Sequence, residues 1–313
     1  MVKLILYRIV AALPVVAISA TLVFLLLRLT PGNPAVILAG DSASPAAIAE
    51  ITAQLGLNKS IPEQFYIWVG QLLQGNLGKS IVSNVPVAQM IADRVGPTAS
   101  LAATTLLLSI VVGVPLGMIA AANQGKWLDR TIMGVSVTGF SVPVFVLGYI
   151  LIFVFSVKLQ WLPVQGFTPI DRGLLPFLRD ITLPTITLGM IYIALFSRIT
   201  RTAMLEVLSS DYVRTAHAKG LSRVVVLTRH ALRNAAIPII SVIGIAFALM
   251  IGGVVVTETV YNIPGLGRLV VDAVLGRDYA VIQGVILVLS VVYVAVNLIV
   301  DVLYVIFDPR IQY

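Results

Sequence analysis

The sequence contains no cysteine, and several familiar catalytic motifs are missing as well. Without cysteine there is no disulfide framework, no thiolate metal site and no thiol nucleophile, although this absence says nothing about the redox compartment. The phosphate-binding pattern Gly-x-x-x-x-Gly-Lys-[Ser/Thr], the metalloprotease pattern His-Glu-x-x-His and the nucleophile pattern Gly-x-Ser-x-Gly are also absent. The chain is therefore predicted not to be an enzyme and not to bind ATP itself.

Charged residues are scarce too. They make up 11% of the 313 residues, whereas soluble domains carry about a quarter. Hydrophobic residues make up 58%, and the mean hydropathy is +1.00. A soluble chain of this composition could not cover its surface with polar groups, so lipid must surround much of it. The net charge of +7 comes from basic residues scattered between apolar runs, which indicates topology signals rather than a face that binds nucleic acid.

Apolar stretches long enough to cross a membrane recur along the whole chain. A spanning helix needs about 20 mostly apolar residues, and the sequence predicts about six such helices. Membrane helices tolerate proline, so Pro115, Pro143 and Pro184 need not end theirs. The fourth stretch is the shortest. The predicted spans are residues 9–29, 99–122, 131–157, 181–197, 237–257 and 280–307.

The first stretch also has features of a secretory signal peptide, because Lys3 and Arg8 precede it. However, it is long, and the sequence Arg28-Leu-Thr-Pro31 has no small-residue cleavage pattern. A retained first helix is the expectation.

Basic residues are distributed unevenly between the connecting segments, and this predicts the orientation. Residues 198–233 hold seven Lys or Arg residues against only Glu206 and Asp211, and residues 123–130 hold Lys126 and Arg130. Both segments are therefore predicted to be cytoplasmic, as are both termini. Residues 30–98, 158–180 and 258–279 are close to charge balance and are predicted to lie outside.

The segment 30–98 is too long for a simple connection. Ser44 and Pro45 have the residue types of a helix start, and a second short helix is expected over residues 62–73. Phe65, Trp68 and Leu72 recur there at helical spacing. We therefore predict a small folded module outside the membrane.

Within the basic segment, a short helix is predicted to begin at Ser210 or Asp211 and to end at Gly220, whose left-handed conformation would let the chain leave the helix. A second helix then leads directly into the fifth span. The apolar residues expected to form a small projecting knob are Tyr212, Val213, Ala216 and Leu221. The alternatives are a solvated basic loop or a loop held by anionic lipid headgroups.

Residues 211–220 read Asp-Tyr-Val-Arg-Thr-Ala-His-Ala-Lys-Gly, and residues 229–238 read Arg-His-Ala-Leu-Arg-Asn-Ala-Ala-Ile-Pro. This pair resembles the signature loop of ABC-importer permeases in the variant typical of dipeptide, oligopeptide and glutathione permeases, and departs from the general Glu-Ala-Ala-x-x-x-Gly form. The resemblance covers the whole chain in order, with Asn33 standing where Asp is more usual. The other matching segments are residues 30–34, 54–57, 75–80, 261–269 and 301–310.

The resemblance implies a type I ABC importer permease fold with three parts: a first transmembrane helix plus the extracytoplasmic module (1–98), a permease core (99–307) and a cytoplasmic tail (308–313). It also implies a second homologous permease, cytoplasmic subunits that bind ATP and Mg, and an extracytoplasmic substrate-binding protein. The implied location is the plasma (inner) membrane of a bacterium. The implied cargo is a di- or oligopeptide, and this chain would hold no cofactor.

The resemblance assigns roles to residues as well. Tyr212 and Ala216 would contact the ATPase, Gly220 would act as hinge or cap, and Arg214 and Lys219 would be polar anchors. The full set implied for coupling is Asp211, Tyr212, Arg214, Thr215, Ala216, His217, Lys219 and Gly220. A second set would gate the pathway or contact the binding protein: Tyr261, Asn262, Pro264, Gly265, Gly267 and Arg268.

Other functions stay open at this point. The same importer class also carries glutathione, nickel, opines or oligosaccharides. An ion-coupled secondary transporter would need internal repeats and ionisable residues near the midplane, and neither was found. Asp301 lies within an apolar run and is either functional or bonded to a neighbouring helix near the cytoplasmic end. His217 and His230 lack the further ligands that a metal site needs.

Overall fold

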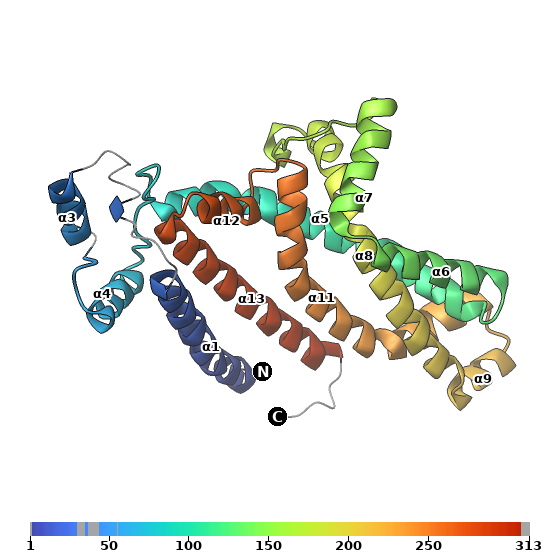
Figure 1. The fold of residues 1–313 in the computed structure, drawn as a ribbon. Coiled ribbons are helices and arrows are strands. Elements are labelled where there is room, and N and C mark those ends of the chain that lie inside the picture. Colours follow the sequence, from blue (N-terminus) through green and yellow to red (C-terminus); the bar gives the residue numbers. More distant parts are fainter. Residues whose placement is uncertain (1, 30–34, 37–43, 55, 308–313) are drawn as a thin grey trace. The chain divides into compact units, whose positions relative to one another are not determined.

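The computed structural model describes residues 2–29, 35–36, 44–54 and 56–307, and these parts are helical with no strand among them (Figure 1). This confirms the predicted all-α class. In chain order the elements are α1 (Val2–Leu29), α3 (Pro45–Gln54), α4 (Ile61–Leu73), α5 (Val87–Ala122), α6 (Trp127–Ser141), α7 (Val144–Leu151), the π-helical η1 (Ile152–Lys158), the 3-10 turn η2 (Ile170–Arg172), α8 (Leu174–Leu208), α9 (Asp211–Ala218), α10 (Arg223–Val225), the π-helical η3 (Val226–Ala231), α11 (Leu232–Val260), α12 (Leu266–Leu275) and α13 (Tyr279–Phe307).

Among the described residues, four helical stretches are long and apolar enough to cross a membrane: Val87–Ala122, Leu174–Leu208, Arg223–Val260 and Tyr279–Val300. The pair formed by α6 and α7 with η1 makes a fifth if it is counted as one span. The helix α1, 28 residues long, coincides with the first predicted span. Each of the six predicted stretches therefore falls on a helix or a broken helix.

The third predicted span is not one continuous helix. The helix α6 ends at Ser141, α7 begins at Val144, and the two are bent by 103°. The prediction of one continuous span through Pro143, over residues 131–157, is therefore wrong. Proline cannot donate a backbone hydrogen bond, and its ring disfavours helical geometry in the residue before it. Val142 accordingly has extended backbone angles of −85° and 124°. Pro115 and Pro184 do lie inside α5 and α8, as predicted.

The fourth predicted span was expected to be the shortest, over residues 181–197, but α8 has 35 residues. It packs against α6, α7 and α11, and its apolar window is 61% buried, the most of the four unbroken stretches in the described chain. Hydropathy understates such a helix, because buried hydroxyls can bond to neighbouring helices. The Oγ1 atoms of Thr185 and Thr104 (α5) are 2.8 Å apart, and the Oγ atoms of Ser197 and Ser136 (α6) are 2.9 Å apart.

Two glycines, Gly113 and Gly117, bring α5 close to α8. A Cβ atom at Gly117 would lie 2.5 Å from the carbonyl oxygen of Ser197, and one at Gly113 would lie 2.9 Å from the Cβ of Phe196. Small residues four positions apart allow such close backbone approach between membrane helices. This contact holds the second half of α8 against α5.

The contacts divide the chain into two compact units. The first unit comprises residues 1–8, 96–268 and 293–313, and the second comprises residues 9–95 and 269–292. In the second unit, the Phe24 ring of α1 lies 5.2 Å and 5.4 Å from the Phe65 and Trp68 rings of α4, measured between centroids. The two short helices predicted between residues 30 and 98 are present as α3 and α4. The sequence division at residue 98 stays a prediction.

Candidate functional site

The helix α9 has well-defined ends. Its N-cap is Ser210, as predicted, with extended backbone angles, although the serine side chain makes no capping hydrogen bond. At the other end Gly220 has φ +76°, which confirms the predicted left-handed exit. The backbone N–H groups of Gly220 and Leu221 donate to the carbonyls of His217 and Ala216, at 2.9 and 3.3 Å. These bonds hold the last turn of α9 in place.

The two faces of α9 have different environments. Val213 and Ala216, three positions apart, are only 2% and 6% exposed and pack on Val226 of η3. Tyr212 is 41% exposed. The apolar residues expected to project together are thus divided, since Val213 and Ala216 attach α9 to the chain's own core. The remaining exposed members of the implied coupling set are Asp211, Arg214, Thr215, His217, Lys219 and Gly220.

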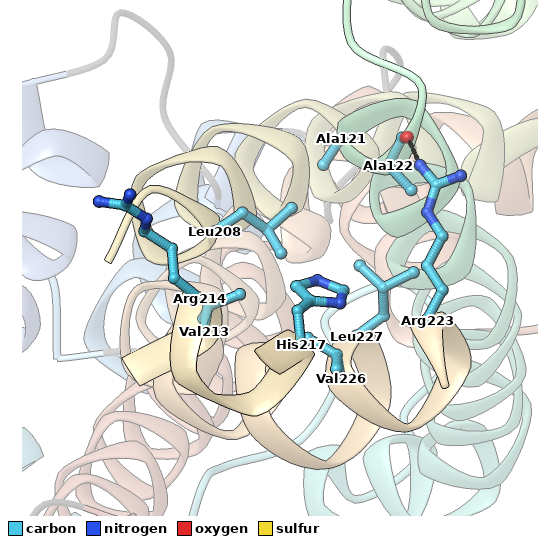
Figure 2. Close-up of a pocket in the computed structure, with 9 residues that line it drawn as sticks. All are labelled: Ala121, Ala122, Leu208, Val213, Arg214, His217, Arg223, Val226 and Leu227. Atoms are coloured by element: carbon cyan, nitrogen blue, oxygen red, sulfur yellow. Dashed lines mark hydrogen bonds between the residues drawn. The ribbon is translucent and has the colours of Figure 1, made fainter. Parts of the chain in front are cut away.

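A groove of about 220 Å³ lies between α9 and the neighbouring helices. Figure 2 shows the His217 ring between the side chains of Arg214 and Arg223 at this groove. The Arg223 guanidinium donates to the carbonyl of Ala122, the last residue of α5. Among the described residues no group of three or more His, Asp or Glu side chains could hold a metal ion. The lining residues are Ala121, Ala122, Leu208, Val213, Arg214, His217, Arg223, Val226 and Leu227.

The second predicted site is the turn that follows α11. It lies at the C-terminal end of α11, whereas α9 precedes the N-terminal end. Tyr261 is 1% exposed, and its hydroxyl lies 2.7 Å from the Thr187 hydroxyl and donates to the Gly148 carbonyl at 3.3 Å. Burial raises the pKa of Tyr261 to about 12. Asn262 has φ +54°. Within the predicted set only Pro264 is exposed, so this turn packs mainly inward.

A buried carboxylate that sequence reasoning missed organises this turn. Glu258 is completely buried, and its side chain accepts hydrogen bonds from Thr98 Oγ1 (2.5 Å) and from the backbone N–H of Arg268 (3.0 Å). A Cβ atom at Gly265 would lie 2.1 Å from Glu258 Oε1, and one at Gly267 would lie 2.9 Å from Oε2. These two glycines therefore make room for the carboxylate. The available signal was an acidic residue directly after an apolar span and shortly before a glycine-rich turn.

Three sequence predictions fall outside the described residues. They concern the segment 30–34 with Asn33, the tail 308–313 and the side chain of Asp301.

The comparisons with known proteins agree with this fold. Residues 113–313 match the family described as binding-protein-dependent transport system inner membrane component, and residues 1–102 match its N-terminal family. The chain belongs to this permease family. It is 52% identical to a probable peptide ABC transporter permease of Sinorhizobium fredii over 309 residues, which is 99% of each chain.

Two further relatives cover the full length. A putative peptide transport system permease of Brucella abortus is 43% identical over 313 residues, and a glutathione transport system permease of Escherichia coli is 42% identical over 313 residues, in both cases 100% of each chain. A solved inward-facing structure of the MetNI methionine ABC transporter matches with a TM-score of 0.60 and 16% identity, over 71% of this chain and 97% of that one. The predicted ABC-importer permease fold is confirmed.

Proposed function

We propose that this chain is one of two permease subunits of an ABC importer for di- or oligopeptides, and that α9 couples it to a cytoplasmic ATPase. The observation that carries the proposal is the construction of α9. A short capped helix presents an exposed face while its other face is packed into the chain's own core. It lies two residues after α8 and leads through α10 and η3 into α11. A displacement of α9 would therefore move two spans.

The exposed and buried faces of α9 suggest two different roles, contact with the ATPase and attachment to the permease core. Tyr212, with the exposed polar residues around it, would contact the ATPase. Its hydroxyl accepts a hydrogen bond from Asn234 Nδ2 (2.9 Å), which orients the ring from the first turns of α11. Ala216, implied by the resemblance to be a contact residue, instead supports the helix from its buried face. Gly220 then provides the left-handed exit from α9, a conformation that most residues with a side chain adopt only at a cost in free energy.

The orientation that we propose places α9 and both termini in the cytoplasm. Support comes from the way the connecting segments gather at the two ends of the first unit. The end of α5 meets α9 and Arg223, so the two basic segments share one end. At the other end, the N–H of Gly166 donates to the carbonyl of Tyr261 at 3.1 Å, and Thr98 meets Glu258. The segments near charge balance thus lie together, as the positive-inside rule requires.

The partners follow from the family and stay proposals for this chain. They are a second homologous permease, ATP-binding subunits that hold ATP and Mg, and an extracytoplasmic binding protein that delivers the cargo. The residues proposed to gate the pathway or to meet that protein are Tyr261, Asn262, Pro264, Gly265, Gly267 and Arg268. The plasma membrane of a bacterium is the proposed location.

Peptide is the favoured cargo because the 52% identical relative is named a peptide permease. Glutathione is the second candidate, because a relative of equal length that is 42% identical is named a glutathione permease. Competition between a labelled dipeptide, a longer peptide and glutathione for uptake by the reconstituted importer separates the two. Uptake that only glutathione blocks would reject the peptide assignment.

The coupling role is tested by Gly220→Asp. The substitution places a side chain on a backbone with φ +76°, in otherwise open space, so the strain falls on the end of α9. We expect uptake to be abolished and ATP hydrolysis to become independent of cargo, while membrane insertion stays normal.

The matched control is Gly75→Asp in the second unit, where φ is +75° and the space is equally open. This variant should still bind the ATPase subunits and hydrolyse ATP in response to cargo. Normal uptake by Gly220→Asp would refute the coupling role.

A further inference from the structure

A largely buried ion pair joins α6 to the C-terminal part of α8, seven residues before α8 ends. Arg201 donates from Nε to Asp129 Oδ1 (2.5 Å) and from Nη2 to Oδ2 (2.8 Å), which is a two-point contact. The N–H of Gly125 donates to the same carboxylate at 2.9 Å. The Asp129 side chain is 5% exposed and that of Arg201 is 25% exposed. The carboxylate therefore has three directional partners and little access to water.

The ion pair lies within the last two turns of α8, the part that carries α9. Here α8 is also pressed against α5, since a Cβ atom at Gly117 would lie 2.6 Å from Thr200 Cβ and 3.0 Å from the Arg201 nitrogen. Ser197, one turn earlier, meets Ser136 of α6. Residues 197–201 of α8 thus contact both α5 and α6.

A second contact between helices follows α9 in the sequence. The Arg223 guanidinium in α10 donates to the carbonyl of Ala122, at the C-terminal end of α5. A cation at a helix C-terminus is also favoured by the helix dipole. In the sequence, α9 therefore lies between two contacts that connect neighbouring helices. One leads from α8 to α6, and the other leads from α10 to α5.

We propose that Asp129 and Arg201 are positioning residues for energy coupling, which fasten α6 to the part of α8 that moves with α9. This inference rests on the proposed docking of α9 onto the ATPase. When the ion pair is intact, a displacement of α9 moves α8 and α11, and it also moves α6 and the turn at Gly125. With the pair broken, α8 moves without α6, and ATP hydrolysis is no longer converted fully into transport.

The test uses the complete importer, with both permeases, the ATPase subunits and the binding protein, reconstituted in liposomes. Asp129→Asn keeps the side-chain shape but removes the charge, and Arg201→Lys keeps the charge but cannot make the two-point contact. We expect the cargo transported per ATP hydrolysed to fall about tenfold in Asp129→Asn and less in Arg201→Lys. The double variant should be no worse than Asp129→Asn, since one substitution already breaks the pair.

Arg130→Gln is the matched control, because it removes an exposed charge next to Asp129 in the sequence. This variant should transport the same amount of cargo per ATP as the unaltered importer. A merely structural role of the ion pair would lower the yield and melting temperature of the assembled importer while leaving that ratio unchanged in what assembles, and this result would overturn the proposal. Failure of both Asp129→Asn and Arg201→Lys to assemble would overturn it as well.

The outcome also separates this inference from the proposed function. If Gly220→Asp uncouples the importer and Asp129→Asn does not, only the role of the ion pair is rejected. If Gly220→Asp leaves transport normal, the docking role of α9 is rejected, whatever the ion pair does.

Discussion

The two ends of the first unit are built differently. At the α9 end most charged side chains are exposed, and the ion pair within α9, between Asp211 and Arg214, has side chains 96% and 80% exposed with a 3.4 Å separation. At the opposite end Glu258 has no exposed surface and is enclosed by glycines. The exposed charges leave the α9 end accessible to the partner proposed above, whereas internal hydrogen bonds hold the Glu258 end together.

Glu258→Ala should have the largest effect on stability. It leaves the Thr98 hydroxyl and the Arg268 N–H without their shared acceptor, and it opens space beside Gly265. Each buried polar group without a partner costs about 1–3 kcal/mol. We expect a large loss of assembled permease and a clear drop in its melting temperature in detergent. Glu206→Ala, at an exposed position of α8, is the control and should melt like the unaltered protein.

Substitution of glycine by alanine sharpens the comparison with a smaller change. At Gly265 the new Cβ atom would lie 2.1 Å from the Glu258 carboxylate, whereas at Gly252, inside α11, nothing lies within 4 Å. Overpacking of this kind costs about 1–3 kcal/mol, while alanine in a helix is about 1 kcal/mol more favourable than glycine. Thermal melting should therefore show Gly265→Ala destabilised and Gly252→Ala unchanged or more stable. Equal melting of the two variants would contradict the close packing around Glu258.

Asp211→Asn should have the smallest effect on the stability of the permease. Exposed ion pairs contribute about 0–1 kcal/mol because water and salt screen them. The melting temperature should be unchanged within error, in contrast to Asp129→Asn, which removes a buried charge from its partner. A drop in melting temperature as large as that of Asp129→Asn would contradict the exposed position of Asp211.

Local sequence patterns were enough to predict some of these features. The cap at Ser210, the exit at Gly220 and the helix between them follow from residue types that favour those backbone conformations. The apolar stretches likewise predicted where the spanning helices lie. The break at Pro143 did not follow, because a membrane helix can retain an internal proline, as α5 retains Pro115.

The charged contacts within the fold could not be predicted in the same way. Asp129 and Arg201 are 72 positions apart, and Thr98 and Glu258 are 160 positions apart, so no local spacing pairs them. Which face of α9 is buried also could not be predicted without the fold. Tyr212 and Val213 are adjacent in the sequence and both have large apolar surfaces. Val213 is the buried one because it packs on Val226 of η3 and on Val207 and Leu208 of α8.

The absence of cysteine allows the most direct test of the central claim, since single cysteines can be introduced without removing native ones. Tyr212→Cys and Val213→Cys differ by one position, but the native residues are 41% and 2% exposed. We predict that a short thiol cross-linker joins the cysteine at position 212 to the ATPase subunit in the assembled importer and leaves the one at position 213 unlinked. Linking at position 213 alone, or at neither position in an active importer, would contradict the docking of α9 through its exposed face.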